Sequence, residues 1–234
     1  MHIGILKVDT VAPQLSAQHG EYSDMIISLL DAVGAGFRYT VLDAEKETLP
    51  RELSAYDGFV ITGSKMSVYD DVDWINNLKR FVVEASRQNK KLLGICFGHQ
   101  LLASAFGGVV GKSSKGWGLG IATFDIYCHK TWQKPAQNSI SLLMSHQDQV
   151  TRLPDGAQHI AGNEFCPYAC FQLGENILGI QGHPEFSPAY LQDLINTRRG
   201  RVGEAVVKKA EQSLYSPNDG LVVGCWISSF LGVL

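Results

Sequence analysis

A cysteine between two glycines is the residue best suited to do chemistry in this chain. Cys96 stands in the run Gly94-Ile95-Cys96-Phe97-Gly98, after an apolar stretch at 92–93 and before an apolar periodic segment at 101–106. A strand, a tight turn and a helix in this order form a nucleophile elbow, whose glycines let the backbone bend sharply. The positive end of the helix would favour thiolate over thiol. We therefore predict that Cys96 is a nucleophile; the alternative is a buried, inert thiol.

A histidine and a glutamate are the predicted partners of this thiol. A cysteine nucleophile needs a base, and the base usually needs an acceptor that orients it. His183 follows a strand-like run at 177–181, and Glu185 lies two residues further on. Side chains two apart on extended backbone share a face, and Pro184 restricts His183 to an extended conformation. We predict the triad Cys96, His183 and Glu185. The alternative for His183 and Glu185 is a structural pair at a strand end.

Acyl transfer also needs donors for the oxyanion. The backbone N–H after the nucleophile, that of Phe97, is one such donor. A second should come from a loop after a neighbouring strand, and Gly63 in Thr62-Gly63-Ser64 suits that position because glycine allows close backbone approach. The alternative is that Gly63 only forms a turn.

The other reactive side chains are predicted to have no catalytic role. His99 lies in the first turn after the elbow, where a cation is disfavoured, so it is predicted to be structural. His146 follows the apolar run 140–144 and is expected to line the pocket without acting as the base. Cys166 and Cys170 lack the two further ligands of a zinc site, so we predict no metal and no cofactor.

A basic run falls near the C-terminal end. Arg198, Arg199 and Arg201 are followed by Lys208 and Lys209. Such runs are mostly solvated helix faces, and this is the prediction here; the alternative is docking of an acidic partner.

Composition limits the class of protein. The chain has 234 residues, 45% of them hydrophobic, and a formal net charge of −3. These values favour one globular domain over residues 1–234 and argue against nucleic-acid binding. Five cysteines without a disulfide framework, no apolar stretch of about 18 residues and no targeting segment predict a reduced cytoplasmic protein without a membrane span.

Hydrophobic periodicity predicts an α/β fold. Strand patterns alternate with helical stripes at 22–33, 74–85 and 101–106, which indicates a doubly wound, mostly parallel sheet with helices on both faces. Asp73 is a candidate N-cap, residues 9–20 are expected to be a loop, and Gly34 and Gly36 end the first helix. Short strands after Gly107 would extend the sheet and add a small antiparallel flap. Helices are expected after the cap Ser187, after Gly200 and over 219–233. Strands are predicted at 2–8, 37–42, 59–62, 92–95, 109–111, 120–128, 158–163, 169–173 and 177–181.

The two motifs together resemble a known family. Gly94-Ile95-Cys96-Phe97-Gly98-His99-Gln100 with Gly182-His183-Pro184-Glu185 is similar to class I glutamine amidotransferases, closest to the glutaminase domain of GMP synthase. The resemblance implies a flavodoxin-like fold, the same Cys-His-Glu triad and a role for Gln100 in holding the glutamyl α-group. It also implies that the stretch Ser145, His146, Gln147 and Asp148 lines the glutamyl pocket.

The stretches Tyr56-Asp57-Gly58-Phe59-Val60-Ile61-Thr62-Gly63-Ser64 and Asp73-Trp74-Ile75 are also similar to plant γ-glutamyl peptidases, which share this fold and act on glutathione conjugates. The peptidase-like branch has Thr62-Gly63-Ser64 where biosynthetic members commonly have Gly-Gly-Pro, and the segment 116–120 lacks a glutamate that many members carry. The resemblance implies hydrolysis of a γ-glutamyl amide, either glutamine or a γ-glutamyl peptide, as a small-molecule substrate. The alternatives are a glutaminase subunit that delivers ammonia to a separate synthetase and a non-enzymatic reactive-cysteine module.

Overall fold

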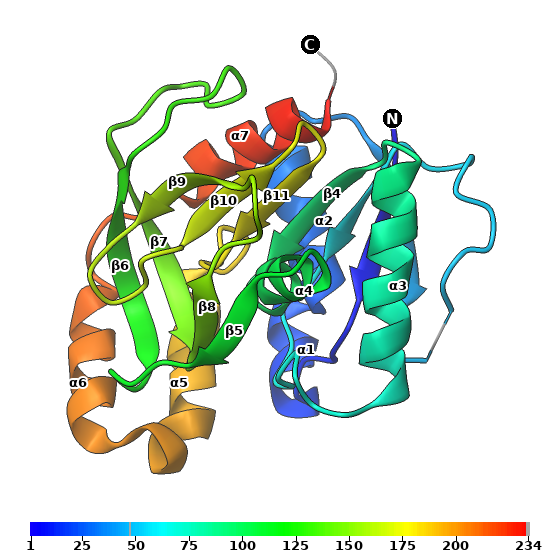
Figure 1. Ribbon diagram of the computed structural model, residues 1–234. Coiled ribbons are helices and arrows are strands. Elements are labelled where there is room, and N and C mark those ends of the chain that lie inside the picture. Colours follow the sequence, from blue (N-terminus) through cyan, green and yellow to red (C-terminus); the bar gives the residue numbers. More distant parts are fainter. Residues whose placement is uncertain (47, 233–234) are drawn as a thin grey trace.

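A nine-stranded mixed sheet forms the centre of the protein (Figure 1). The computed structural model describes residues 1–46 and 48–232. Half of the sheet is parallel, as predicted, and its strands lie in the order β2, β1, β3, β4, β11. These strands are β1 (His2–Lys7), β2 (Arg38–Asp43), β3 (Gly58–Ile61), β4 (Lys91–Ile95) and β11 (Ile177–Ile180).

The other half of the sheet is antiparallel. It continues from β11 through β10 (Cys170–Leu173), β9 (Gln158–Gly162) and β6 (Gly118–Ile126) to β7 (Ser139–His146). A separate antiparallel pair joins β5 (Val109–Lys112) to β8 (Asp148–Arg152), in agreement with the predicted small extension. Neither β7 nor β8 is among the strands predicted from the sequence.

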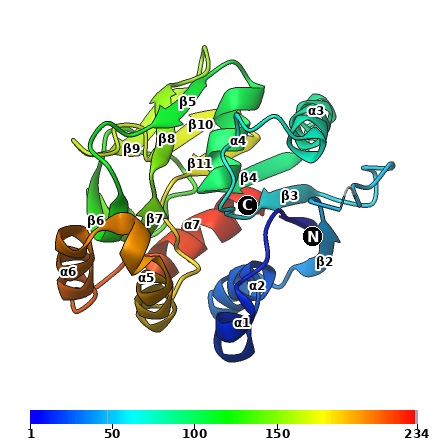
Figure 2. The same ribbon diagram turned by 90° about the horizontal axis from the view of Figure 1, so that it is seen from below.

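Helices cover both faces of the sheet, as Figure 2 shows. On one face lie α2 (Tyr22–Ala32) and α7 (Gly220–Leu231), and on the other lie α3 (Asp73–Arg87) and α4 (Phe97–Ala105). Successive side chains of β4 point to opposite faces of the sheet. Leu93 packs in the cluster with α2 and α7, whereas Leu92 packs in the cluster with α3 and α4. The predicted doubly wound α/β class is confirmed.

The antiparallel half has its own helices. A third apolar cluster joins Leu143 of β7 to α5 (Pro188–Val202) and α6 (Glu204–Ser213), and includes Leu15 of the short helix α1 (Pro13–His19). Ser187 caps α5 by accepting a bond of 3.0 Å from the Tyr190 N–H, as predicted. No helix among the described residues is long and apolar enough to cross a membrane.

Three local predictions are wrong. The expected loop at 9–20 contains α1, which begins at Pro13, a residue preset for the first helical turn. The N-cap of α3 is Val72 rather than Asp73, and the Val72 side chain makes no capping hydrogen bond. The second C-terminal helix begins after Gly203 and not after Gly200, because the φ of 95° at Gly203 interrupts the helical conformation. The predicted end of the last helix at 233 lies outside the described residues.

Parallel strands bring the motif residues to one edge. β3, β4 and β11 are neighbours, and their carboxyl ends are followed by Gly63, Cys96 and His183 respectively. In open α/β sheets ligands bind outside the carboxyl ends of the strands. A ligand is therefore expected to bind at the carboxyl ends of β3, β4 and β11.

Candidate active site

Cys96 occupies a strained turn between β4 and α4. Its φ of 52° and ψ of −102° lie in a region that residues with a side chain rarely adopt. The Cys96 N–H donates to the Ile180 carbonyl of β11 over 2.9 Å, and the Gln100 N–H donates to the Cys96 carbonyl over 3.0 Å. Both ends of the turn are thus fixed, which holds the thiol at the edge of the sheet and at the start of a helix.

The two flanking glycines are required by close backbone contacts. A Cβ on Gly94 would lie 2.3 Å from the carbonyl carbon of Gly98, and a Cβ on Gly98 would lie 2.5 Å from the Ile61 carbonyl oxygen. These distances are below van der Waals contact, and the opposing atoms belong to the backbone. The elbow therefore packs directly against β3.

Gly98→Ala is expected to lower the free energy of unfolding by about 1–3 kcal/mol, because β3 and α4 must separate to admit the methyl group. Gly111→Ala is the matched control: a Cβ there meets nothing within 4 Å. Urea denaturation measures both free energies. Equal stability of the two variants would contradict this account.

His183 is held by three contacts. Its backbone N–H donates to the Leu143 carbonyl over 2.8 Å. Its ring Nδ1 lies 2.7 Å from Glu185 Oε1, and the ring stacks on Phe186 with centroids 3.8 Å apart. The side chains of His183 and Glu185 are only 4% and 1% exposed. With Nδ1 donating to the carboxylate, the other ring nitrogen is available to the thiol, and His183 makes a side-chain hydrogen bond with Cys96. The structure thus brings all three predicted triad residues together.

The charge of Glu185 controls the protonation of His183. Burial by itself would lower the pKa of the imidazole, but the charges of Glu185 and Cys96 and the hydrogen bonds to both raise that pKa from 6.5 to about 10. A proton on His183 is therefore stable across the neutral range beside Cys96. An imidazolium next to a thiol is the arrangement that activates cysteine nucleophiles.

This pKa predicts how stability depends on pH. Because the folded-state pKa of His183 is raised, its stabilising contribution is complete below pH 6.5 and is lost as the pH rises towards 10. The expected slope is at most about 1.4 kcal/mol per pH unit across that window. Denaturant titrations from pH 6.5 to 10 should show a steeper loss for the wild type than for His183→Gln. Identical slopes would contradict the prediction.

The predicted oxyanion donors lie beside the thiol. A Cβ on Gly63 would be 3.7 Å from Cys96 Cβ and 3.1 Å from His183 Cε1, so any side chain would enter the space between thiol and imidazole. The Gly63 carbonyl is turned away, accepting from the Thr62 hydroxyl over 3.2 Å. Within residues 1–46 and 48–232, neither the Gly63 N–H nor the Phe97 N–H has a hydrogen-bond partner. Both donors are available.

A cavity of about 120 Å³ adjoins the thiol and holds the other predicted residues. Gln100 uses both amide hydrogens, donating to the Asp148 carbonyl over 2.8 Å and to Gln181 Oε1 over 3.0 Å, so its amide oxygen remains for a donor on a ligand. His146 Nδ1 is fixed 2.8 Å from the same Asp148 carbonyl. The cavity is lined by Cys96, Gln100, Ser145, His146, Gln147 and Asp148, among others.

Comparison with known proteins decides the family. Residues 18–196 match the model of the family described as glutamine amidotransferase class-I. The chain belongs to this family. Class I glutamine amidotransferases are enzymes, and γ-glutamyl peptidase 4 of Arabidopsis thaliana is 34% identical over 184 residues, which cover 76% of this chain and 73% of that protein. GMP synthase of Porphyromonas gingivalis is 37% identical over 148 residues, but these are 58% of this chain and only 26% of the synthase.

Solved structures of other proteins share this fold. A glutamine amidotransferase from Thermotoga maritima superposes with a TM-score of 0.77 at 19% identity, covering 99% of this chain and 97% of the other. One from Methylobacillus flagellatus gives 0.76 at 21% identity, covering 98% and 92%. At these identities the likeness concerns the fold alone.

His99, His146, Cys166 and Cys170 are all buried. His99 is fully buried, and burial lowers its pKa to about 3, which agrees with a structural role. Burial also lowers the pKa of His146 to about 4, so it lines the cavity as a neutral ring. Cys166 and Cys170 are buried in the core, and burial raises the pKa of Cys166 to about 12. The described residues contain no group of three or more metal-ligating side chains.

The prediction of a solvated basic face is wrong for Arg198. Lys208 and Lys209 are exposed, as expected of a solvated helix face. Arg198, however, is half-buried: it donates to Ser145 Oγ over 2.7 Å and lines the cavity of Cys96. Tyr22 is a further residue missed from the sequence, and it borders a small second cavity beside His183.

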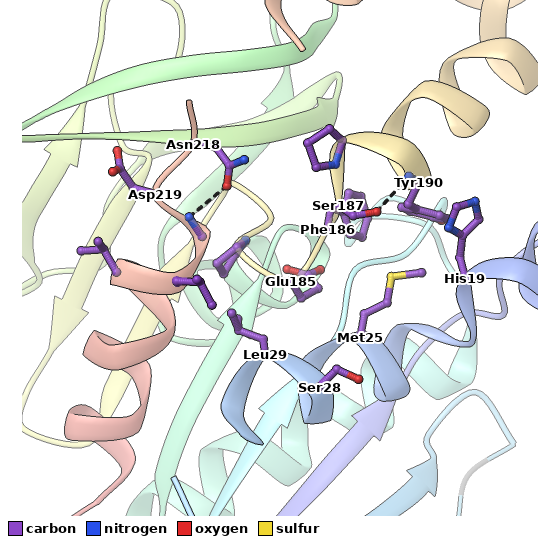
Figure 3. A pocket seen from close by; sticks show the side chains of 15 residues that line it. His19, Met25, Ser28, Leu29, Glu185, Phe186, Ser187, Tyr190, Asn218 and Asp219 are labelled. Carbon is purple, nitrogen blue, oxygen red and sulfur yellow. Dashed lines mark hydrogen bonds between the residues drawn. The ribbon is translucent and has the colours of Figure 1, made fainter. Parts of the chain in front are cut away.

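A separate cavity of about 550 Å³ lies on the Glu185 side of the site (Figure 3). It opens between α2, α5 and the start of α7, with Met25 and Leu29 on one side and Tyr190 on another. Glu185 lies at its border, and its Oε2 is buried without a hydrogen-bond partner in the described part of the chain. Cys96 does not line this cavity.

Proposed function

We propose that the protein hydrolyses γ-glutamyl amides through a γ-glutamyl thioester on Cys96. The observation that carries this proposal is the meeting of Cys96, His183 and Glu185 at the carboxyl ends of β4 and β11, with His183 Nδ1 2.7 Å from Glu185 Oε1. Family membership supports the chemistry, since relatives are named γ-glutamyl peptidases and glutamine-hydrolysing synthases.

The first half of the reaction acylates the enzyme. Cys96 Sγ attacks the γ-carbonyl carbon, and a C–S bond forms as the carbonyl becomes an oxyanion held by the N–H groups of Gly63 and Phe97. His183 gives its proton to the leaving nitrogen as the C–N bond breaks. A donor of this kind contributes roughly 3–4 kcal/mol to the stability of such an oxyanion.

The second half releases glutamate. Neutral His183 takes a proton from water, the hydroxide attacks the thioester carbonyl, and the C–S bond breaks to return the thiolate and imidazolium. Glu185 keeps His183 in the required tautomer throughout. Gln100, with the wall of Ser145, His146 and Gln147, holds the glutamyl part of the small-molecule substrate, and the amide oxygen of Gln100 accepts from its ammonium group.

Trapping the acyl-enzyme tests this proposal. The protein is mixed with γ-glutamyl substrates, quenched in acid within one turnover and digested for mass spectrometry. The expected result is a glutamyl adduct on the peptide that contains Cys96, formed from glutamine or a γ-glutamyl peptide and absent from His183→Gln. Turnover without any adduct on Cys96, or an adduct on another residue, would overturn the mechanism.

A second candidate is a glutaminase subunit that supplies ammonia to a synthetase. It is favoured by the likeness to GMP synthase, of which this chain spans about a quarter. Such a subunit would turn over glutamine only and would be nearly idle alone. Glutamate release from glutamine and from γ-glutamyl dipeptides by the purified protein separates the two candidates.

A further inference from the structure

Helix α5 directs one arginine into the active site. Arg198 lines the cavity that holds Cys96 and Gln100, and it also lines the small cavity that holds His183. Its Nη1 donates to Ser145 Oγ over 2.7 Å, which fixes the guanidinium at the boundary between the Cys96 cavity and the His183 cavity. Arg198 is thus positioned near both halves of a scissile amide, the acyl part at Cys96 and the leaving part at His183.

The charge of Arg198 has no counter-ion in the part of the chain that the structure describes. No carboxylate in the described ranges lies within ion-pairing distance of it, whereas its neighbour Arg199 pairs with Glu204 at 2.6 Å and Glu211 at 2.5 Å. The acidic side chain that lines the Cys96 cavity, Asp148, accepts hydrogen bonds from the Ser67 and Tyr69 hydroxyls instead. Since a half-buried, unpaired guanidinium is costly, a ligand carboxylate is its natural partner.

Besides Lys65, which pairs with Asp9 over 2.9 Å, two further cations line this cavity and make it positive. Lys112 and Arg201 line it, and Arg201 lies over the Trp117 ring at 5.6 Å. Neither has a carboxylate partner within residues 1–46 and 48–232. Glutamine carries one carboxylate and one ammonium group, so it leaves this excess of positive charge unmatched. A substrate with a second carboxylate would match it.

The leaving group must lie on the His183 side. His183 protonates the leaving nitrogen in the proposed reaction, so the atoms bonded to that nitrogen lie among Tyr22, Phe186, Leu194 and Arg198. The cavity there is only about 20 Å³, so a whole amino acid cannot fit inside and must extend past Arg198 towards the surface. In a γ-glutamyl amino acid the carboxylate is attached to the atom next to the leaving nitrogen, within reach of the guanidinium.

We propose that Arg198 binds the α-carboxylate of the leaving amino acid, and that the enzyme therefore prefers γ-glutamyl amino acids to glutamine. This inference rests on the proposed function. The planar guanidinium suits bidentate binding of a carboxylate, and Ser145 holds it in place before the substrate arrives. Ammonia as a leaving group offers Arg198 nothing to bind.

The test compares γ-glutamylalanine, its C-terminal amide and glutamine by kcat/KM. The wild type is expected to favour the acid over the amide roughly 30–100-fold, because a site built for a polar group rejects the analogue that lacks it. Arg198→Met should bring that ratio close to one, because its kcat/KM falls far more on the acid than on the amide or on glutamine. Arg199→Met removes the same charge from the next residue of α5 and should keep the ratio of the wild type; Cys96→Ala is the blank.

The outcomes separate this inference from the proposed function. Equal use of acid and amide by the wild type, with both reactions dependent on Cys96, overturns the role of Arg198 and leaves the hydrolase standing. An equal loss on all substrates in Arg198→Met also overturns it, since Arg198 would then bind the glutamyl part or support the fold. If no substrate is turned over in a Cys96-dependent manner, the proposed function fails and the inference fails with it.

Discussion

Replacing Cys96 with alanine is expected to abolish glutamate release, with kcat reduced by roughly 10⁴-fold or more, as for other covalent nucleophiles. No thioester can form without the sulfur, and the nearby Cys166 is buried with its pKa raised to about 12, so it cannot substitute as a thiolate. The measurement is glutamate release under substrate saturation, beside a thermal melt that verifies the fold.

Cys128→Ala is the matched control for this variant, since Cys128 is a half-buried cysteine outside the active-site cavities. It should retain the kcat of the wild type. Substantial turnover of the same substrate by Cys96→Ala would exclude Cys96 as the nucleophile.

Glu185→Gln is expected to lower kcat by roughly 10³–10⁴-fold with little change in KM, as when the orienting carboxylate of other triads is made neutral. The amide can donate to His183 Nδ1, which places the proton on the wrong nitrogen for catalysis. It also removes a charge that raises the pKa of His183 to about 10, so the imidazolium beside Cys96 is lost. Steady-state kinetics measures the effect.

A second readout distinguishes this effect from general damage. The rate at which iodoacetamide alkylates Cys96 near pH 7 should fall in Glu185→Gln, because the thiolate loses its partner cation. Glu164→Gln changes a glutamate whose side chain is 97% exposed and should alter neither measurement. A kcat within a few-fold of the wild type in Glu185→Gln would show that Glu185 does not orient His183.

The motif residues were predictable because their geometry is local. Glycines at 94 and 98 allow the tight turn at Cys96 wherever the rest of the chain goes, and Pro184 restricts His183 to an extended conformation. Parallel strands then bring the two motifs to one edge of the sheet without further information. The position of Gly63 follows from the same topology, since β3 lies beside β4.

Strand β7 could not be recognised by alternation because both of its faces are buried. Leu142 and Met144 pack in one core cluster, while Leu143 packs in another with α5 and α6. A strand covered on both sides presents a continuous apolar run, which periodicity alone cannot assign. Helix α1 was missed for the opposite reason: Leu15 is its only buried residue, so it has no apolar stripe.

The inward position of Arg198 could have been predicted from its helical spacing, although it stands in a run of basic residues. Leu191, Leu194 and Ile195 are buried on α5, and Arg198 continues the same face at the spacing of one helical side. Arg198 and Arg199 are adjacent in the sequence and were both assigned to a solvated face. On a helix, however, adjacent residues point in different directions, and only Arg198 continues the buried face. Which side of α5 meets the active site is set by packing against β7, which no local pattern records.

The backbone at Cys96 ties the enzyme's chemistry to a thermodynamic disadvantage. A side chain at φ 52° and ψ −102° costs about 1–3 kcal/mol, a cost that glycine escapes. Selection for a durable fold and selection for catalysis therefore act in opposite directions on this codon. In a descendant lineage that no longer needed the thiol, glycine is the replacement that mutation and stability together would favour, and its presence there would mark a relative that kept the architecture after losing the reaction.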